Sequence, residues 1–113
     1  MEFDELSIAL LVLRSDAPEL DEEEDGELQD AHLLHLADLQ DAGFVRAAGP
    51  LQDDHFRGLV ILDAPPEIAR RLIEQDSAVR AGRFDAVVMP WLVPSGVLRF
   101  GSASLLHSVP GIE

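Results

Sequence analysis

The chain contains no cysteine, which excludes disulfides and thiolate metal sites as sources of stability. It has no apolar run long enough to span a membrane. Its first residues, Met-Glu-Phe-Asp, are acidic where a secretory signal peptide would be basic. Together these absences predict a cytoplasmic protein that does not depend on an oxidising compartment.

Positive charge is also scarce, because 8 basic residues stand against 22 acidic ones and the formal net charge is -14. This excess of negative charge would repel a nucleic-acid backbone, and no basic stripe is present to overcome the repulsion. The same argument applies to anionic membrane surfaces. We therefore expect neither nucleic acid nor membrane as a partner.

The negative charge is densest in residues 16–27, where like charges favour a solvated, mobile loop. The acidic residues of this stretch are Asp16, Glu19, Asp21, Glu22, Glu23, Glu24, Asp25 and Glu27. A calcium site is the alternative, but an EF-hand needs alternating ligands around a central glycine, and the spacing does not fit. We therefore predict an acidic loop that binds no metal tightly.

A single domain with a modest core is expected from 113 residues, of which 47% are hydrophobic. Short apolar runs predict four strands, and helical periodicity with flanking stop signals predicts two helices. The strands are expected over 6–13, 44–48, 56–62 and 84–93, and the helices over 28–42 and 67–76. Gly49-Pro50 should end the second strand, Pro90 should break the fourth late, and the second helix could continue toward Val79.

The order β-α-β-β-α-β is that of a ferredoxin-like α+β fold, a four-stranded antiparallel sheet with both helices on one face. Several strands are apolar on both faces, as in residues 59–62 and 87–89. Two helices can cover only one face, and monomers rarely expose an apolar patch as large as the other face would be. A second copy packed sheet to sheet would cover it, so the sequence predicts a homodimer.

Helical geometry places His32 in the middle of the buried face of the first expected helix. Leu28, Leu36 and Leu39 lie within about 40° of it around the helix axis. Ala37 points the other way, toward the side that also carries the aspartates of this helix. A histidine is therefore expected among the apolar side chains of the core-facing stripe.

The second expected helix carries a comparable polar residue, because Ile68 and Leu72 define its buried face and Asp76 lies about 40° from Leu72. A buried carboxylate is costly unless it is paired or reaches solvent. Since both helices cover one sheet face, we expect Asp76 and His32 within hydrogen-bond or one-water reach, in or beside one pocket. A carboxylate that orients an imidazole serves general acid–base catalysis. The alternative is that His32 is a satisfied core residue and Asp76 caps its helix.

Four histidines also allow a metal hypothesis, because His32 and His35 are spaced i, i+3 and Asp53, Asp54 or His55 could add a ligand. Neither an HExxH-type motif nor a cysteine supports it, and no glycine-rich loop opens a helix to bind phosphate. We therefore expect no metal and no cofactor.

An ordered set of short motifs resembles the YCII-related (YciI-like) family over roughly residues 6–92. The set consists of Ala31-His32-Leu33, Gly43, Ala48-Gly49-Pro50, Gly58, Gln75-Asp76, Gly82 and Pro90-Trp91. The resemblance implies a ferredoxin-like protomer that dimerises into an α+β barrel, with His32 and Asp76 as the active-site pair. A chlorinated hydroquinone dehydrochlorinase looks like a relative, and muconolactone isomerases share the general architecture.

Two positions depart from the family pattern. Gln29 stands where members often have an arginine three residues before the histidine, and Ser77 stands where a proline usually follows the aspartate. Because the missing arginine could have held an anionic substrate, the resemblance names no substrate for this chain. The family-like domain is expected over residues 1–95, followed by a C-terminal extension over 96–113. Residues 97–100 of that extension could form an added edge strand or an exchanged strand.

These features favour a metal-independent isomerase or lyase acting on a small molecule, with His32 as general base or acid and Asp76 as its orienting partner. The rival interpretation is a non-catalytic dimer that binds a small ligand or serves as an accessory module. The sequence identifies neither the substrate nor the reaction.

Overall fold

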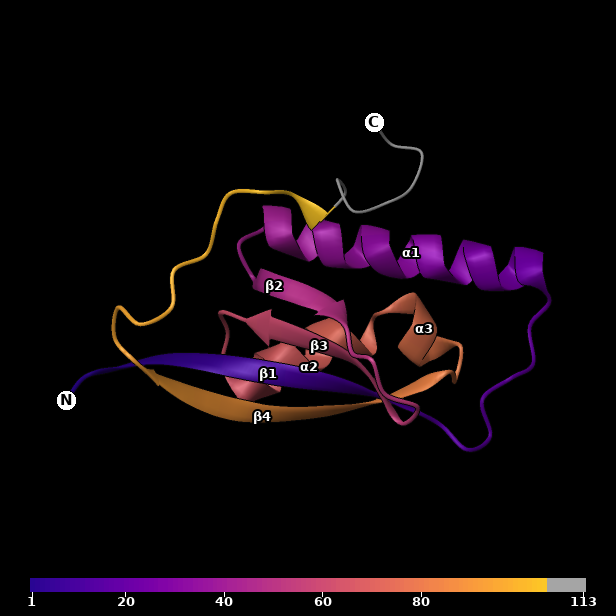
Figure 1. Ribbon diagram of the computed structural model, residues 1–113, viewed down its shortest axis with the longest axis horizontal. Helices are drawn as coiled ribbons and strands as arrows, with labels where there is room; N and C mark the ends of the chain where they lie inside the picture. The colour runs from indigo at the N-terminus through magenta and orange to yellow at the C-terminus, as the bar shows by residue number, and fades with distance from the viewer. Residues whose placement is uncertain (106–113) are drawn as a thin grey trace.

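A computed structural model describes residues 1–105. Along the chain they form the strand β1 (Phe3–Leu13), the helix α1 (Glu22–Asp41), the strands β2 (Val45–Pro50) and β3 (Phe56–Leu62), the helices α2 (Pro66–Glu74) and α3 (Ser77–Arg80), and the strand β4 (Phe84–Pro94). The strands form one antiparallel sheet in the order β2-β3-β1-β4 (Figure 1). The α+β fold with ferredoxin-like order is confirmed, and α3 is an additional short turn.

The helices cover one face of the sheet in two groups (Figure 1). The long helix α1 packs against β2 and α3, whereas α2 packs on β1 and β4. This arrangement leaves α1 and α3 next to each other above the sheet, so residues from both helices can meet. It is the placement on which the functional site depends.

The helix α1 begins at Glu22, not near residue 28, so the acidic loop expected over 16–27 is wrong from Glu22 onward. The physical reason is a capping box. The N–H of Glu24 donates to Oδ1 of Asp21 over 2.8 Å, and Oε1 of Glu24 accepts from the N–H of Asp21 over 3.4 Å. Acidic side chains in the first turn also interact favourably with the helix dipole. Charge density that suggested a loop therefore stabilises the start of a helix.

Two prolines stay within strands that the sequence predicted they would end. The strand β2 runs through Gly49 and Pro50, and β4 runs through Pro90, which lies opposite Ser7 of β1. Both β2 and β4 are edge strands, each with one side that has no partner strand in the sheet. A proline there need not remove a ladder hydrogen bond. The strand β3, in contrast, has the predicted bounds of Phe56–Leu62.

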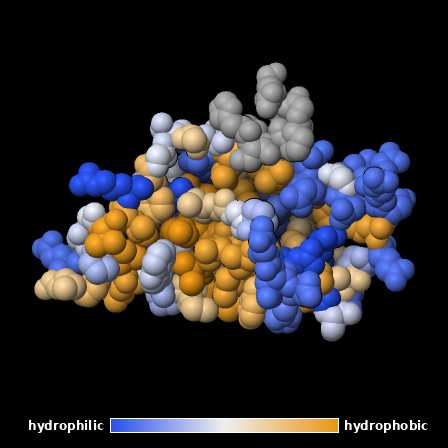
Figure 2. Space-filling model, viewed as in Figure 1, coloured by the Kyte–Doolittle hydropathy of each residue, from blue (hydrophilic) through white to orange (hydrophobic). Residues whose placement is uncertain are grey.

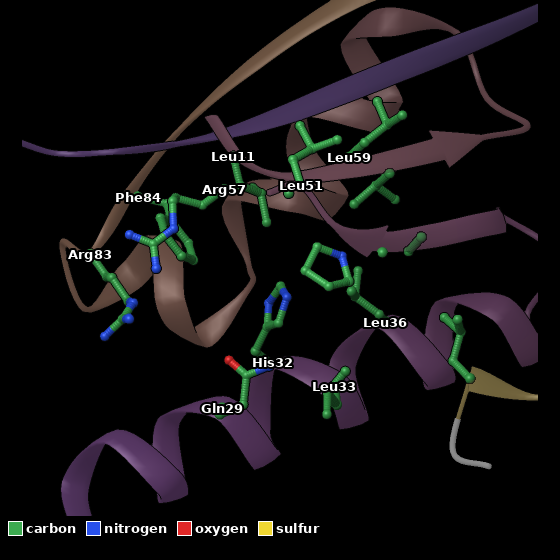
Figure 3. Close-up of a pocket in the computed structure, with 16 residues that line it drawn as sticks. Leu11, Gln29, His32, Leu33, Leu36, Leu51, Arg57, Leu59, Arg83 and Phe84 are labelled. Carbon is green, nitrogen blue, oxygen red and sulfur yellow. The ribbon is translucent and has the colours of Figure 1, made fainter. Parts of the chain in front are cut away.

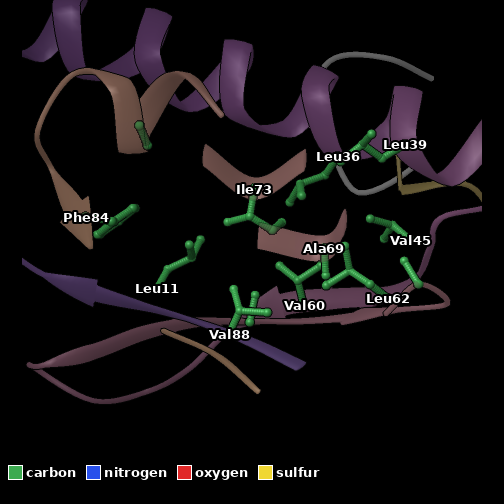
Figure 4. Close-up of a cluster of buried hydrophobic side chains, with 13 residues drawn as sticks. Leu11, Leu36, Leu39, Val45, Val60, Leu62, Ala69, Ile73, Phe84 and Val88 are labelled. Carbon is green, nitrogen blue, oxygen red and sulfur yellow. The ribbon is translucent and has the colours of Figure 1, made fainter. Parts of the chain in front are cut away.

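The hydrophobic core lies between the sheet and the helices (Figure 4). Its most deeply buried members are Ala9, Val45, Val60, Leu62, Ala69 and Ile73. Removing such apolar surface from water is the main source of stability in a domain of this size. One of the two buried polar residues of the described chain is Ser7 of β1, whose Oγ donates to the carbonyl oxygen of Ala64 over 2.7 Å. Its burial is therefore compensated by a hydrogen bond.

The other face of the sheet carries a group of hydrophobic side chains that we call the outer apolar face. From the register of the strands its members are Ile8, Leu10, Leu59, Ile61, Val87, Met89 and Trp91. Figure 2 shows hydrophobic residues gathered where Figure 1 draws the strands. Val87 and Met89 are 42% and 38% exposed, and no described helix covers them. Among the described residues, no helix has the length and apolar character needed to cross a membrane.

The segment after β4 returns over the C-terminal half of α1 (Figure 1). The amide of Gln40 holds it, because Nε2 donates to the carbonyl oxygen of Ala103 over 3.0 Å and Oε1 accepts from the N–H of Leu105 over 2.9 Å. Ala37 of α1, expected to face solvent, is only 1% exposed, so the buried stripe is wider than predicted. Residues 97–100 join no strand of the sheet, and the added edge strand expected there is not formed. Residues 106–113 of the expected extension lie outside the described residues.

Candidate functional site

The structure brings His32 and Asp76 together. Nδ1 of His32, on α1, lies 2.7 Å from Oδ1 of Asp76, which directly precedes α3. The side chain of His32 is 12% exposed and that of Asp76 is 1% exposed. The two residues are therefore within the hydrogen-bond reach that helical geometry predicted, in a setting largely shielded from water.

Asp76 reaches this position by a different route from the one predicted. The sequence placed it on the buried face of one continuous helix, but α2 ends at Glu74 and Asp76 is the extended N-cap residue of α3. Oδ2 of Asp76 accepts from the N–H of Ala78 over 3.0 Å and from that of Val79 over 3.3 Å. The carboxylate therefore caps a helix with one oxygen and binds the imidazole with the other.

The buried face of α2 is also rotated relative to the prediction. Ala69 and Ile73 are 0% and 1% exposed, whereas Ile68, expected to be buried, is 40% exposed. Four apolar residues at positions 68, 69, 72 and 73 make a wide stripe, so periodicity alone did not fix which edge of the stripe faces the sheet. The burial of Asp76 was predicted correctly even though its helix was not.

The hydrogen bonds of Asp76 assign the tautomer of His32. Two backbone N–H groups donate to Oδ2, and a carboxylate accepts at both oxygens, so the short contact at Oδ1 is a hydrogen bond donated by Nδ1–H of His32. In the neutral imidazole the lone pair then lies on Nε2. This nitrogen has no hydrogen-bond partner among the described residues. The geometry thus leaves one basic atom of His32 free.

A cavity of about 270 Å³ lies beside His32, between α1 and the part of the sheet formed by β2 and β3 (Figure 3). It is lined by Leu11, Gln29, His32, Leu33, Leu36, Ala48, Gly49, Pro50, Leu51, Arg57, Gly58, Leu59, Val60, Arg83, Phe84 and Leu105. The walls are mainly hydrophobic, and the only ionisable side chains among the described lining residues are those of His32, Arg57 and Arg83. A cavity of this size is slightly smaller than the roughly 300–1,000 Å³ that is usual for small-molecule sites.

The ring of Phe84, the first residue of β4, stands edge-on to His32, with the ring centroids 6.5 Å apart and an interplanar angle of 65°. Phe84 is 9% exposed and belongs to the core cluster. The imidazole is therefore held between a carboxylate on one side and an aromatic wall of the cavity on the other. Such packing restricts the ring to the orientation that the hydrogen bond requires.

The remaining histidines do not join this pair. Nε2 of His35 binds the carbonyl oxygen of Leu72 over 2.8 Å, so His35 and His32 have different partners despite their i, i+3 spacing. His55 lies in the turn between β2 and β3, with its ring edge-on to Phe56. Among residues 1–105 no three histidine or acidic side chains lie close enough together to hold a metal ion. The geometry gives the metal hypothesis no support.

Apart from His32, the residues that line the cavity were not foreseen from the sequence, and three of them show why. Arg57 lies in a strand of ordinary apolar composition, Arg83 follows the glycine that ends α3, and Leu105 belongs to the C-terminal segment. They line the cavity because β3, the turn before β4 and the segment that ends at Leu105 converge on α1. No local pattern signals such convergence, although an arginine within an apolar strand is an unusual residue that could have been noted.

Comparison with known proteins gives a family match. Residues 9–92 match the family model described as YCII-related domain, and this range contains both His32 and Asp76. No curated protein matches the chain.

Proposed function

The chain belongs to the YCII-related domain family, and we propose that it is a metal-independent acid–base enzyme of isomerase or lyase type that acts on a small molecule. The observation that carries the proposal is the 2.7 Å contact between Nδ1 of His32 and Oδ1 of Asp76 beside an apolar cavity. General acid–base catalysis needs a group that exchanges protons near neutral pH, and histidine is the side chain best suited to this.

In the proposed reaction Nε2 of His32 takes a proton from a carbon of the bound molecule, and the electron pair of the broken C–H bond stays on the substrate. In an isomerisation the imidazolium returns the proton to a second carbon as the double bond moves. In an elimination the electron pair forms a new double bond while a leaving group departs with its own bonding pair, and the imidazolium passes its proton to the leaving group or to water. In both cases Asp76 keeps Nδ1–H in place and stabilises the imidazolium by its negative charge.

Hydrogen–deuterium exchange tests this function without knowledge of the natural substrate. The protein is incubated in D2O with small carbon acids and lactones, and loss of C–H signals is followed by proton NMR. We expect exchange above background for at least one compound and a loss of about 10²- to 10⁴-fold in His32→Gln. His55→Gln is the matched control, because His55 is exposed and does not line the cavity, and it should exchange at the wild-type rate.

The same experiment also distinguishes an enzyme from a non-catalytic ligand-binding or accessory module. Exchange that persists in His32→Gln would contradict the acid–base role. If compounds bind in the cavity and none is exchanged or turned over by the wild-type protein, the chain is a ligand-binding or accessory module.

We further propose that the protein is a homodimer that pairs through the outer apolar face. The support is the exposure of Val87 and Met89, which lie on that face in the edge strand β4, since isolated domains rarely leave contiguous apolar surface in water. Light scattering at micromolar concentration should give twice the chain mass of 12.3 kDa. Met89→Glu should give the monomer mass, whereas Ile68→Glu should not, because Ile68 is equally exposed on the helical side. A wild-type monomer would refute the proposal.

A further inference from the structure

Arg57 lines the cavity because of an irregularity in β3. The pairing of β1 with β3 matches Leu11 with Gly58 and Val12 with Phe56, so Arg57 has no partner in the register. An extra residue of this kind is a β-bulge, which breaks the alternation of side chains and re-aims the bulged residue. Phe56 borders the surface around Leu10, whereas Arg57 and Gly58 both line the cavity on the helical side.

Gly58 makes room for this arrangement. A Cβ at position 58 would lie 3.3 Å from Cδ1 of Leu11, which is closer than ordinary van der Waals contact. The glycine therefore leaves room for Leu11, which also lines the cavity, beside β3. In Figure 3 Arg57 extends from the sheet, with its guanidinium next to Phe84 and Arg83 at one end of the group of lining residues, while His32 extends from α1.

The charge distribution around the cavity differs sharply from that of the whole chain. The protein has 22 acidic residues and a net charge of -14, yet none of the described lining residues is acidic. Arg83 is partly neutralised, because its Nη1 lies 2.7 Å from Oδ1 of the exposed Asp25. The side chain of Arg57 has no ion pair or hydrogen bond with any described residue, although it is only partly exposed. Arg57 is thus a free cation at an apolar wall.

We infer that the cavity takes a small carboxylic acid with an apolar body, and that Arg57 binds its carboxylate and sets the specificity for anions. The guanidinium fork matches the two oxygens of a carboxylate, and a low-dielectric wall strengthens this pairing. With about 270 Å³ available, the apolar body is limited to roughly the size of one substituted ring. The inference rests on the proposed function, because it names the substrate class for the site of His32.

Benzoate and benzamide provide a direct test, because they share shape and ring but differ in charge. Each is titrated into the 15N-labelled protein, and the shifts of backbone amides that line the cavity are followed by NMR. We expect saturable benzoate binding on the order of millimolar affinity and at least about tenfold weaker binding of benzamide. The net charge of -14 of the whole chain opposes the binding of an anion, so it would not by itself produce a preference for benzoate.

The variants assign the preference to one residue. Arg57→Gln should weaken benzoate binding by about tenfold or more and leave benzamide binding unchanged, and Arg57→Lys should restore part of the loss. Arg71→Gln is the matched control, because it removes the same charge from an exposed position of α2 outside the cavity. His32→Gln should keep the preference for benzoate, so failure of catalysis and failure of anion binding can be told apart. Equal binding of the two probes, equal effects of Arg57→Gln and Arg71→Gln, or no saturable binding of benzoate would each overturn the inference.

Discussion

Replacing Asp76 by alanine should destabilise the protein more than the loss of a helix cap alone. The substitution removes the acceptor of two backbone N–H groups at the start of α3 and also the acceptor of Nδ1–H of His32. The imidazole is 12% exposed, so water replaces the lost carboxylate only in part. The change therefore combines two separate costs at one residue.

The expected magnitude follows from these two costs. Loss of an N-cap typically costs about 1 kcal/mol, and a buried donor without its partner costs about 1–3 kcal/mol. The sum of about 2–4 kcal/mol is a large part of the roughly 5–15 kcal/mol that stabilises a typical domain. It should lower the melting temperature by roughly 10 °C or more.

The assay is urea unfolding at one fixed protomer concentration, because dimerisation would make the apparent stability depend on concentration. Asp21→Ala is the matched control, since Asp21 caps α1 through the N–H of Glu24 but is exposed and has no histidine partner. It should cost about 1 kcal/mol. Asp76→Asn should also cost little, because asparagine caps helices as well as aspartate does.

The reasoning would be refuted if Asp76→Ala cost no more than Asp21→Ala. It would equally fail if Asp76→Asn were as destabilising as Asp76→Ala, because the cap and the imidazole contact would then not be separable contributions. A double-mutant cycle with His32→Ala isolates the second contribution.

Two further predictions concern the sheet and its turn. Gly58→Ala should lower the free energy of unfolding by about 1 kcal/mol or more because the new methyl group crowds the buried Leu11. Gly49→Ala is the control, because its Cβ would meet nothing within 4 Å. Equal urea midpoints for the two variants would contradict the prediction. The N–H groups of Phe56 and then of its neighbour His55 donate to Asp53 and hold the pKa of that carboxyl below its ordinary value of 3.8. A lowered folded-state pKa contributes stability above the unfolded-state pKa, and this contribution disappears as pH falls through the folded-state pKa. Asp53→Asn should therefore destabilise the protein at neutral pH, but not in acid below the folded-state pKa. The prediction would be refuted if a carbon NMR titration of the wild-type protein showed that the pKa of Asp53 is not lowered.

Much of the fold could be predicted because its determinants are local. The bounds of β3 follow from a largely apolar run between turn residues, and the polar residues His32 and Asp76 stood out against apolar helical stripes. The start of α1 at Glu22 could also have been predicted, since Asp21 and Glu24 have the spacing of a capping box. The density of acidic residues pointed instead to a loop.

Other features depend on tertiary context and could not be predicted. Pro90 stays in β4 because β4 is an edge strand. The order of the strands in the sheet cannot be predicted from a local sequence pattern. The bulge that turns Arg57 into the cavity arises from a register shift between β1 and β3. Asp76 was expected near His32, but the break that makes it the N-cap of α3 was not. The cavity itself is formed by segments from six parts of the chain that meet only in the folded state.

The central claim is that Asp76 holds His32 with Nδ1–H directed to the carboxylate and with a basic Nε2 free beside the cavity. Nitrogen-15 NMR of the imidazole ring, at a pH where His32 is neutral, measures this directly. The account predicts that Nδ1 carries the proton in the wild-type protein, and that the proton moves to Nε2 in Asp76→Asn, whose amide can donate to Nδ1. A wild-type ring protonated at Nε2, or a tautomer that Asp76→Asn leaves unchanged, would contradict the account.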